Sequence, residues 1–206
     1  ENKLHIVGPM RLDKVWEKAT SMNNSNQYFK ETRILVAPGH NDTEFVVRLV
    51  IKAVLSTNYK VTIKSHPKVP ESFIKEIIGQ NSKNNINNRV KIVKKGNIYN
   101  YMENHEIFLS SYSSTGVEAI AFGLPIILLK SKRTPDMSLF KNWTDNILYA
   151  DNKIKLNEHI DLLSNDNKFR LKYQKILKTV LNESFYKVDS LSSDRFVNYL
   201  KNNHFY

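Results

Sequence analysis

Three hydroxyl residues in a row, Ser113, Ser114 and Thr115, stand between a strand-like run at 107–110 and a small-residue segment that predicts a helix start. A helix start leaves backbone N–H groups unpaired and carries the positive end of the helix dipole, so it attracts anions. The hydroxyls add donors for phosphate oxygens, and Glu118, one turn into the helix, can accept from the two hydroxyls of a ribose. This pattern predicts a nucleotide site.

Each of these residues also has a purely structural interpretation. A serine before a helix is most often an N-cap, and a carboxylate in the first helical turn gains from the dipole whatever else it does. A cap needs only one hydroxyl, whereas several occur here, and this surplus favours a ligand. For Glu118 the structural role and the ribose role both stay open.

Two histidines stand directly after two other apolar, strand-like runs. One is His40, preceded by Gly39, and the other is His66, followed by Pro67. In an open parallel sheet, ligands collect at the carboxyl ends of the strands, where loops lead into helices. We therefore expect these four residues at the same edge of the sheet as the serine run. The alternative for either histidine is a loop residue that is solvated or bonded to a neighbouring loop.

The order of the apolar segments predicts an α/β fold. Short apolar runs alternate with segments of helical period, which is the pattern of βαβ units and of a mostly parallel, Rossmann-like sheet with helices on both faces. We place this nucleotide-binding domain at residues 33–150. Its strands are expected at 34–37, 60–65, 90–93, 107–110 and 125–129, with helices at about 42–57, 72–80 and 98–103. A further helix is expected to follow the serine-rich turn and to run through Phe122.

The flanking segments predict smaller additions. Residues 1–32 are expected to be a segment from another domain, with a strand at 4–7, a helix at 11–20 and a polar loop at 21–31. Residues 130–142 read as a loop, in which Lys130 and Arg133 are candidates for contact with a substrate phosphate or carboxylate, although exposed loop cations are usually only solvated. A C-terminal tail, 151–206, follows an edge strand at 147–150 and is expected to hold helices at 156–163, 169–181 and 192–202.

Composition bounds the class of protein. With 206 residues, 41% of them hydrophobic, the chain can bury a substantial core. It contains no cysteine, so disulfides and thiolate metal sites are excluded. We predict no metal site, and His159 and Asp161 form the pair to inspect. The longest apolar stretches are interrupted by charges or by Gly-Leu-Pro and fall short of the roughly 20 residues that a membrane span needs.

The chain is strongly basic, with 31 Lys and Arg against 20 Asp and Glu, a net charge of +11. Such an excess favours anionic partners, which include phosphorylated substrates, nucleic acid and an acidic membrane surface. A biased coding composition, visible in the many asparagines, explains much of this excess equally well and takes the larger share. We expect a cytoplasmic protein, and the charge leaves peripheral association with the inner membrane face open.

Three motifs together carry a family resemblance. They are Ser65-His66-Pro67, the run Ser-Ser-Thr-Gly-Val-Glu-Ala at 113–119, and Gly-Leu-Pro-Ile at 123–126. Over residues 33–130 the chain resembles the C-terminal, nucleotide-binding half of GT-B glycosyltransferases. Within that fold it is most similar to bacterial surface-polysaccharide enzymes: capsule Kdo transferases, polysialyltransferases and CDP-glycerol glycerophosphotransferases.

The resemblance implies a CMP- or CDP-activated donor, which is a substrate rather than a cofactor. It places His66 near the phosphate as the catalytic candidate, the run 113–115 around the phosphate, and Glu118 on the ribose. It implies an inverting, metal-independent transferase of capsule or cell-envelope polysaccharide synthesis. Residues 7–13 resemble the point where such enzymes leave their N-terminal domain, so the chain is expected to be a fragment without the domain that binds the glycan acceptor.

Two other functions stay open. A nucleotide-sugar epimerase of the same fold would bind a nucleotide at the same place, with acid and base residues in its cleft. A noncatalytic basic module would bind nucleic acid, but Phe45, Phe73 and Phe108 occupy core-like positions instead of alternating with basic residues as stacking platforms do. We therefore expect no nucleic-acid partner.

Overall fold

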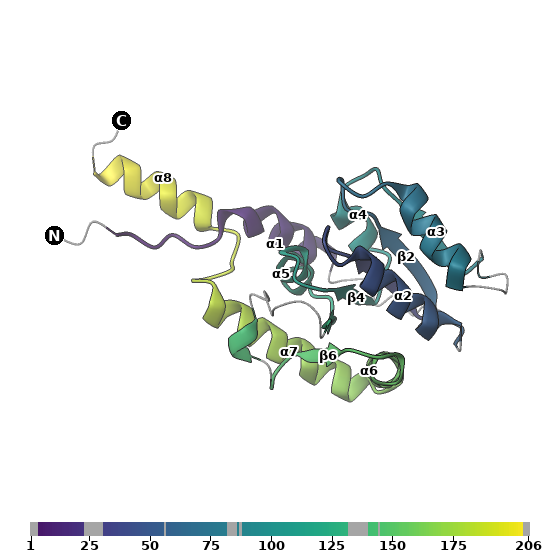
Figure 1. Cartoon of the computed structure of the whole chain (residues 1–206). Helices are drawn as coiled ribbons and strands as arrows, with labels where there is room; N and C mark the ends of the chain where they lie inside the picture. The colour runs from purple at the N-terminus through teal and green to yellow at the C-terminus, as the bar shows by residue number, and fades with distance from the viewer. Residues whose placement is uncertain are drawn as a thin grey trace.

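A six-stranded sheet forms the centre of the protein (Figure 1). The computed structural model describes residues 4–22, 31–55, 57–81, 86, 88–131, 140–143 and 145–203. Every strand pair is parallel, and the order is β3-β2-β1-β4-β5-β6. The strands are β1 (Arg33–Ala37), β2 (Lys60–Lys64), β3 (Val90–Val93), β4 (Ile107–Ser110), β5 (Ile126–Leu129) and β6 (Leu148–Ala150). The predicted Rossmann-like α/β fold is confirmed.

The inner strands are apolar because both of their faces are covered. Every residue of β4 and β5 is buried, as in parallel sheets enclosed by helices, whereas no residue of the edge strand β3 is fully buried. The predicted edge strand near residue 150 is present as β6, which pairs with β5.

Helices cover both faces of the sheet. The chain runs from β1 to β2 in one direction across the sheet and from β4 to β5 in the other, and right-handed crossovers in opposite directions place α2 and α5 on opposite faces. On the first face α2 packs against α3, and on the second α5 packs against α1. The helices are α1 (Met10–Met22), α2 (Thr43–Val54), α3 (Glu71–Asn81), α4 (Ile98–Met102), α5 (Thr115–Ala121), α6 (Lys153–Asn165), α7 (Asn167–Ser184) and α8 (Ser192–Asn202), with a 3₁₀ turn at Lys141–Trp143.

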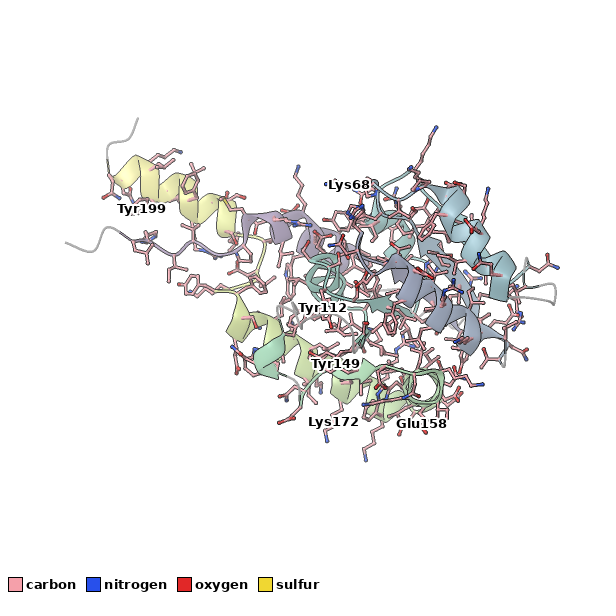
Figure 2. All side chains as sticks on the ribbon, viewed as in Figure 1. Lys68, Tyr112, Tyr149, Glu158, Lys172 and Tyr199 are labelled. Atoms are coloured by element: carbon pink, nitrogen blue, oxygen red, sulfur yellow. The ribbon has the colours of Figure 1, made fainter. Side chains whose placement is uncertain are left out.

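The N-terminal segment differs from expectation. The strand predicted at 4–7 is wrong: residues 4–9 have no regular structure and pair with no strand of the sheet, and Leu4 and Ile6 are 82% and 59% exposed. They run instead beside α8, where His5 stacks on Tyr199 with ring centroids 4.3 Å apart (Figures 1 and 2). Alternation of apolar residues makes a strand only where another strand offers hydrogen bonds. The loop predicted at 21–31 lies mostly outside the described residues.

Helix α1 belongs to the packed core. Leu12 and Val15 are buried in the same hydrophobic cluster as the sheet. Asp13 then joins α1 to α8, because its carboxylate accepts hydrogen bonds from the backbone N–H groups of Ser192 (3.2 Å) and Ser193 (2.8 Å) and from the Ser193 hydroxyl (2.7 Å). None of the described helices is long and apolar enough to cross a bilayer.

Candidate functional site

The order of the strands creates one place where the sheet reverses direction. From β1 the chain moves outward to β2 and β3, then returns through α4 to β4 on the other side of β1. The loops that follow β1 and β4 at their carboxyl ends therefore diverge from one point, which is where open α/β sheets bind ligands. Because β1 lies between β2 and β4, the loop after β1 lies between the loops that follow β2 and β4.

Two of these loops bring the predicted histidines together. The rings of His40, after β1, and His66, after β2, lie 5.6 Å apart and are tilted by 54°. His40 Nδ1 contacts the Asn41 side-chain oxygen at 2.9 Å. His66 Nδ1 accepts a hydrogen bond from the Lys68 backbone N–H at 3.2 Å, so the neutral ring of His66 carries its proton on Nε2. Pro67 follows at the exposed edge of this loop.

The surroundings of His66 favour its neutral form. Its pKa lies below the usual 6.5, first because burial disfavours the imidazolium and then because His40 and Lys68 add positive charge nearby. A neutral Nε2–H group is a hydrogen-bond donor. An anion placed between the two rings would reverse the sign of the local field and favour the charged ring.

Gly39 lets the loops after β1 and β4 approach each other. A Cβ atom at Gly39 would lie 2.9 Å from Asp42 Oδ1 and 3.5 Å from Ser111 Oγ. Both of these polar atoms are buried and have no hydrogen-bond partner in the described structure. Asp42 occupies the N-cap position of α2, yet its side chain makes no cap hydrogen bond; instead Thr43 Oγ1 donates to the Gly39 carbonyl at 2.6 Å.

The serine run meets α5 as predicted, but its members differ in role. Ser113 Oγ accepts from the Thr115 backbone N–H at 3.3 Å and from the Thr115 hydroxyl at 2.7 Å, so Ser113 supplies the local cap. Ser114 is exposed and makes no side-chain cap hydrogen bond. Helix α5 has seven residues, so its dipole is short and the donors must come mainly from the loop itself.

Glu118 lies deeper than its motif suggests. Its side chain is only 3% exposed and forms an ion pair with Arg11 of α1, whose side chain is 62% exposed. Tyr99 lies beside the pair, and its pKa is raised by burial and by the Glu118 charge. Position in the first turn of a helix cannot reveal this contact, because the two residues are 107 positions apart in sequence. The ribose contact of Glu118 stays a prediction. A bound ribose would compete with Arg11 for the Glu118 carboxylate.

Three of the four remaining candidates have structural partners. His159 Nε2 lies 3.0 Å from the Tyr149 carbonyl, and the Asp161 carboxylate accepts from the Tyr59 hydroxyl. In the described ranges no three His, Asp or Glu side chains gather as metal ligands would. The Lys130 ammonium lies 5.7 Å from the Tyr149 ring centre, and Arg133 lies outside the described residues.

Comparison with known proteins places the fold. No family profile matches the sequence, and no curated protein matches it. The C-terminal CMP-Kdo binding domain of WaaA from Acinetobacter baumannii matches 82% of this chain and 98% of its own, at 11% identity and a TM-score of 0.54. A putative UDP-N-acetylglucosamine 2-epimerase from Listeria monocytogenes matches 97% of this chain at 16% identity and a TM-score of 0.63. A variant of the wall teichoic acid polymerase TagF soaked with CDPG matches 93% at 14% identity and a TM-score of 0.59.

The share of each relative that is matched is informative. The chain spans about half of the epimerase and of the polymerase, 53% and 48% of their lengths, but nearly all of the CMP-Kdo binding domain. Identities of this size establish the fold alone. The chain therefore has the fold of the C-terminal, nucleotide-binding domain of the GT-B proteins, as its motifs predict.

Proposed function

We propose that this chain is the donor-binding domain of a glycosyltransferase or glycerophosphotransferase that uses a CMP- or CDP-activated donor in bacterial surface-polysaccharide synthesis. The observation that carries the proposal is the convergence of three polar loops at the reversal of a GT-B sheet. The CMP-Kdo binding domain and the polymerase soaked with CDPG support a cytidine nucleotide, since they share this fold.

The chemistry of the proposal is electrostatic. When a nucleoside phosphate leaves the donor, negative charge builds on its oxygens, and fixed donors that point at those oxygens lower the barrier. The donors that we assign to this role are the His66 Nε2–H group, the Ser114 hydroxyl and the backbone N–H groups of residues 113 and 114. The Thr115 N–H group already donates to Ser113 Oγ. His66 becomes easier to protonate as the phosphate gains charge, so it is the candidate general acid.

An epimerase is the second candidate, because proteins described as UDP-N-acetylglucosamine 2-epimerases share the fold to the same degree. The nucleotide base separates the two. A transferase of the proposed kind prefers CMP and CDP, whereas the epimerase prefers UDP and releases an epimer or free sugar from its UDP-sugar without any acceptor.

A nucleotide panel tests the proposal. We expect CMP or CDP to bind in calorimetry and to raise the melting temperature more than UMP or UDP, since a ligand at 100 times its Kd adds about 2.7 kcal/mol to the free energy of unfolding. His66→Ala should abolish this shift. His5→Ala is the matched control, because His5 is an exposed histidine that stacks on α8. A preference for UDP would favour the epimerase, and equal or absent responses would refute the cytidine site.

A further inference from the structure

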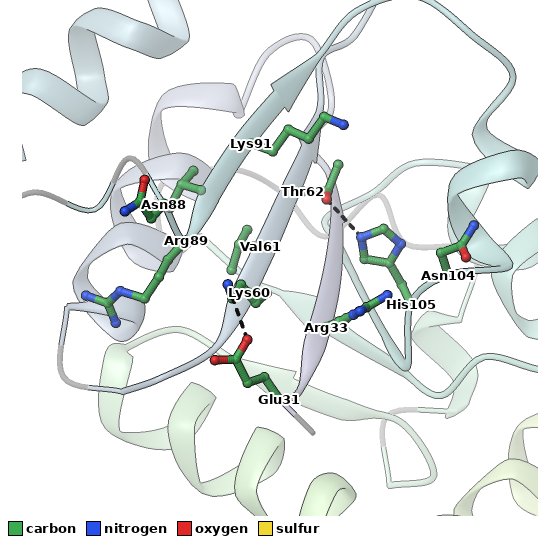
Figure 3. Close-up of a pocket in the computed structure, with 11 residues that line it drawn as sticks. Glu31, Arg33, Lys60, Val61, Thr62, Asn88, Arg89, Lys91, Asn104 and His105 are labelled. Carbon is green, nitrogen blue, oxygen red and sulfur yellow. Dashed lines mark hydrogen bonds and ion pairs between the residues drawn. The ribbon is translucent and has the colours of Figure 1, made fainter. Parts of the chain in front are cut away.

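A cavity opens at the edge of the sheet opposite the proposed nucleotide site, where the strands begin (Figure 3). It has a volume of about 340 Å³. Arg33 and Lys60 are the first residues of β1 and β2, and Val90 is the first residue of β3. The nucleotide site proposed above lies at the carboxyl ends of the strands, so one ligand of nucleotide size does not occupy both places.

The register of the strands gathers cations on one face of the sheet. Arg33 and Lys60 are partners across β1 and β2, and Thr62 and Lys91 are partners across β2 and β3. Lys60 and Thr62 are two residues apart, so all four side chains point to the same face. The connection from β3 to β4 crosses that face with only the five-residue α4, which leaves room for a cavity at this corner.

The lining is strongly positive. Three cationic side chains, those of Arg33, Lys60 and Lys91, line the cavity against the single carboxylate of Glu31 among its lining residues. Arg89 also lines it, but its guanidinium donates to the backbone carbonyls of Val54 and Thr57. Glu31 pairs with Lys60 at 3.2 Å. Arg33 and Lys60 stand side by side on adjacent strands, where like charges repel. Glu31 offsets part of this repulsion, and a bound anion would offset more of it.

A histidine stands at the same face with its ring fixed in place. His105 Nε2 lies 2.9 Å from the Thr62 hydroxyl, and Nδ1 lies 2.5 Å from the Tyr101 carbonyl. The carbonyl can only accept, so Nδ1 carries the proton and the Thr62 hydroxyl donates to Nε2. Burial lowers the pKa of His105, and the charges of Arg33 and Lys91 lower it further, although the Tyr101 carbonyl opposes them. His105 is thus a neutral ring close to two cations.

We propose that this basic pocket binds a phosphate group, as a second anion site separate from the nucleotide site. Arg33 and Lys91 supply the charge from strands on either side of β2, and the side chains of Thr62 and Asn104 complete the polar lining (Figure 3). An arginine offers a fork of donors that fits phosphate oxygens, and a lysine adds a point charge. The phosphate comes from a small soluble phosphate compound or from an anionic lipid headgroup.

Phosphate titration of the whole chain tests the proposal. Pyrophosphate is added at low ionic strength in a phosphate-free buffer, and binding is measured by calorimetry and by the NMR shifts of the His105 ring. Lys91→Gln should weaken pyrophosphate binding about tenfold, the worth of one hydrogen bond to a charged group. Arg33→Gln should weaken it at least as much. Lys172→Gln is the matched control, since it removes an equal charge from an exposed position on α7 (Figure 2).

The NMR signals of the His105 ring report on the pocket itself. Pyrophosphate attracted to basic residues elsewhere on the surface would not change them. A bound phosphate should raise the pKa of His105, because it reverses the field of Arg33 and Lys91. His66→Ala should leave this titration unchanged, which separates failure of the pocket from failure of the nucleotide site. No change of the His105 signals with pyrophosphate, or equal losses in Lys91→Gln and Lys172→Gln, would overturn the proposal.

Vesicles distinguish the two sources of phosphate. Cosedimentation with vesicles of phosphatidylglycerol that Lys91→Gln abolishes and Lys172→Gln keeps would identify a lipid headgroup. Pyrophosphate binding without cosedimentation would identify a soluble compound. If the protein binds neither pyrophosphate nor the vesicles, the proposed site is refuted.

Discussion

Glu118 has two candidate partners: Arg11, which it contacts through Oε1, and the ribose of the proposed donor. An exposed ion pair adds about 0–1 kcal/mol to stability, whereas breaking a buried pair by removing one partner costs about 3–5 kcal/mol. This pair is intermediate, because Glu118 is 3% exposed and Arg11 is 62% exposed. Arg11→Met leaves a buried carboxylate without its cation and should cost about 2 kcal/mol. Glu118→Gln leaves Arg11 in water and should cost about 1 kcal/mol.

Urea unfolding measures both values, and the double variant closes a thermodynamic cycle. A coupling free energy of at least about 0.5 kcal/mol is expected, because the two residues are in contact. For a chain of this length, each kcal/mol corresponds to about 2–4 °C in melting temperature. A larger cost for Glu118→Gln than for Arg11→Met would refute the reasoning, since it would mean that the exposed arginine and not the buried carboxylate depends on the pair.

The same variants decide whether Glu118 also binds ribose. If it does, wild-type protein should bind CMP more tightly than dCMP, which lacks the 2′ hydroxyl, and Glu118→Gln should reduce that difference. Arg11→Met should tighten CMP binding, because the ribose no longer competes with a guanidinium. A CMP to dCMP ratio that is equal in all three proteins would assign Glu118 to structure alone.

Further predictions follow from the described contacts. Asp13→Asn should lower the free energy of unfolding by about 1–3 kcal/mol, because it weakens three hydrogen bonds at the start of α8, and limited proteolysis should then cut near α8 first. Gly39→Ala should cost about 1–3 kcal/mol in urea unfolding, since its Cβ would meet a carboxylate oxygen at 2.9 Å, whereas the control Gly79→Ala, with open space in an exposed helix, should add about 0.5–1 kcal/mol. The pKa of His105 in the folded protein lies below 6.5, so the unfolded chain binds more protons and the free energy of unfolding should fall as the pH drops below 6.5. His105→Gln should reduce this fall in thermal melts recorded from pH 7 to pH 5.

Much of the fold could be predicted because its signals are local. The run at 34–37 is apolar throughout and the run at 107–110 is apolar up to its last residue, Ser110, since strands covered on both faces need no polar side. Turn-forming or polar residues follow both runs. The segment 4–7, which was predicted to be a strand, is also rich in apolar residues, but no strand of the sheet lies beside it to pair with. Periodicity reports which residues prefer burial, whereas pairing depends on what stands beside the segment in space.

The two sites differ in predictability for a related reason. All loops at the carboxyl ends of parallel strands lie at one edge of the sheet, so a rule about strand ends predicts that His40 and His66 share that edge. The pairing of β1 with β2 then brings their rings together. The basic pocket needs the register, since a shift of one residue in β2 would turn Lys60 to the other face and separate it from Arg33. The Arg11 to Glu118 pair needs the packing of α1 on α5, which neither helix's own sequence specifies. Site residues in the loops that follow strands can therefore be predicted from a sequence. Site residues on the face of a sheet or helix can be recognised only once the neighbouring elements have been placed in space.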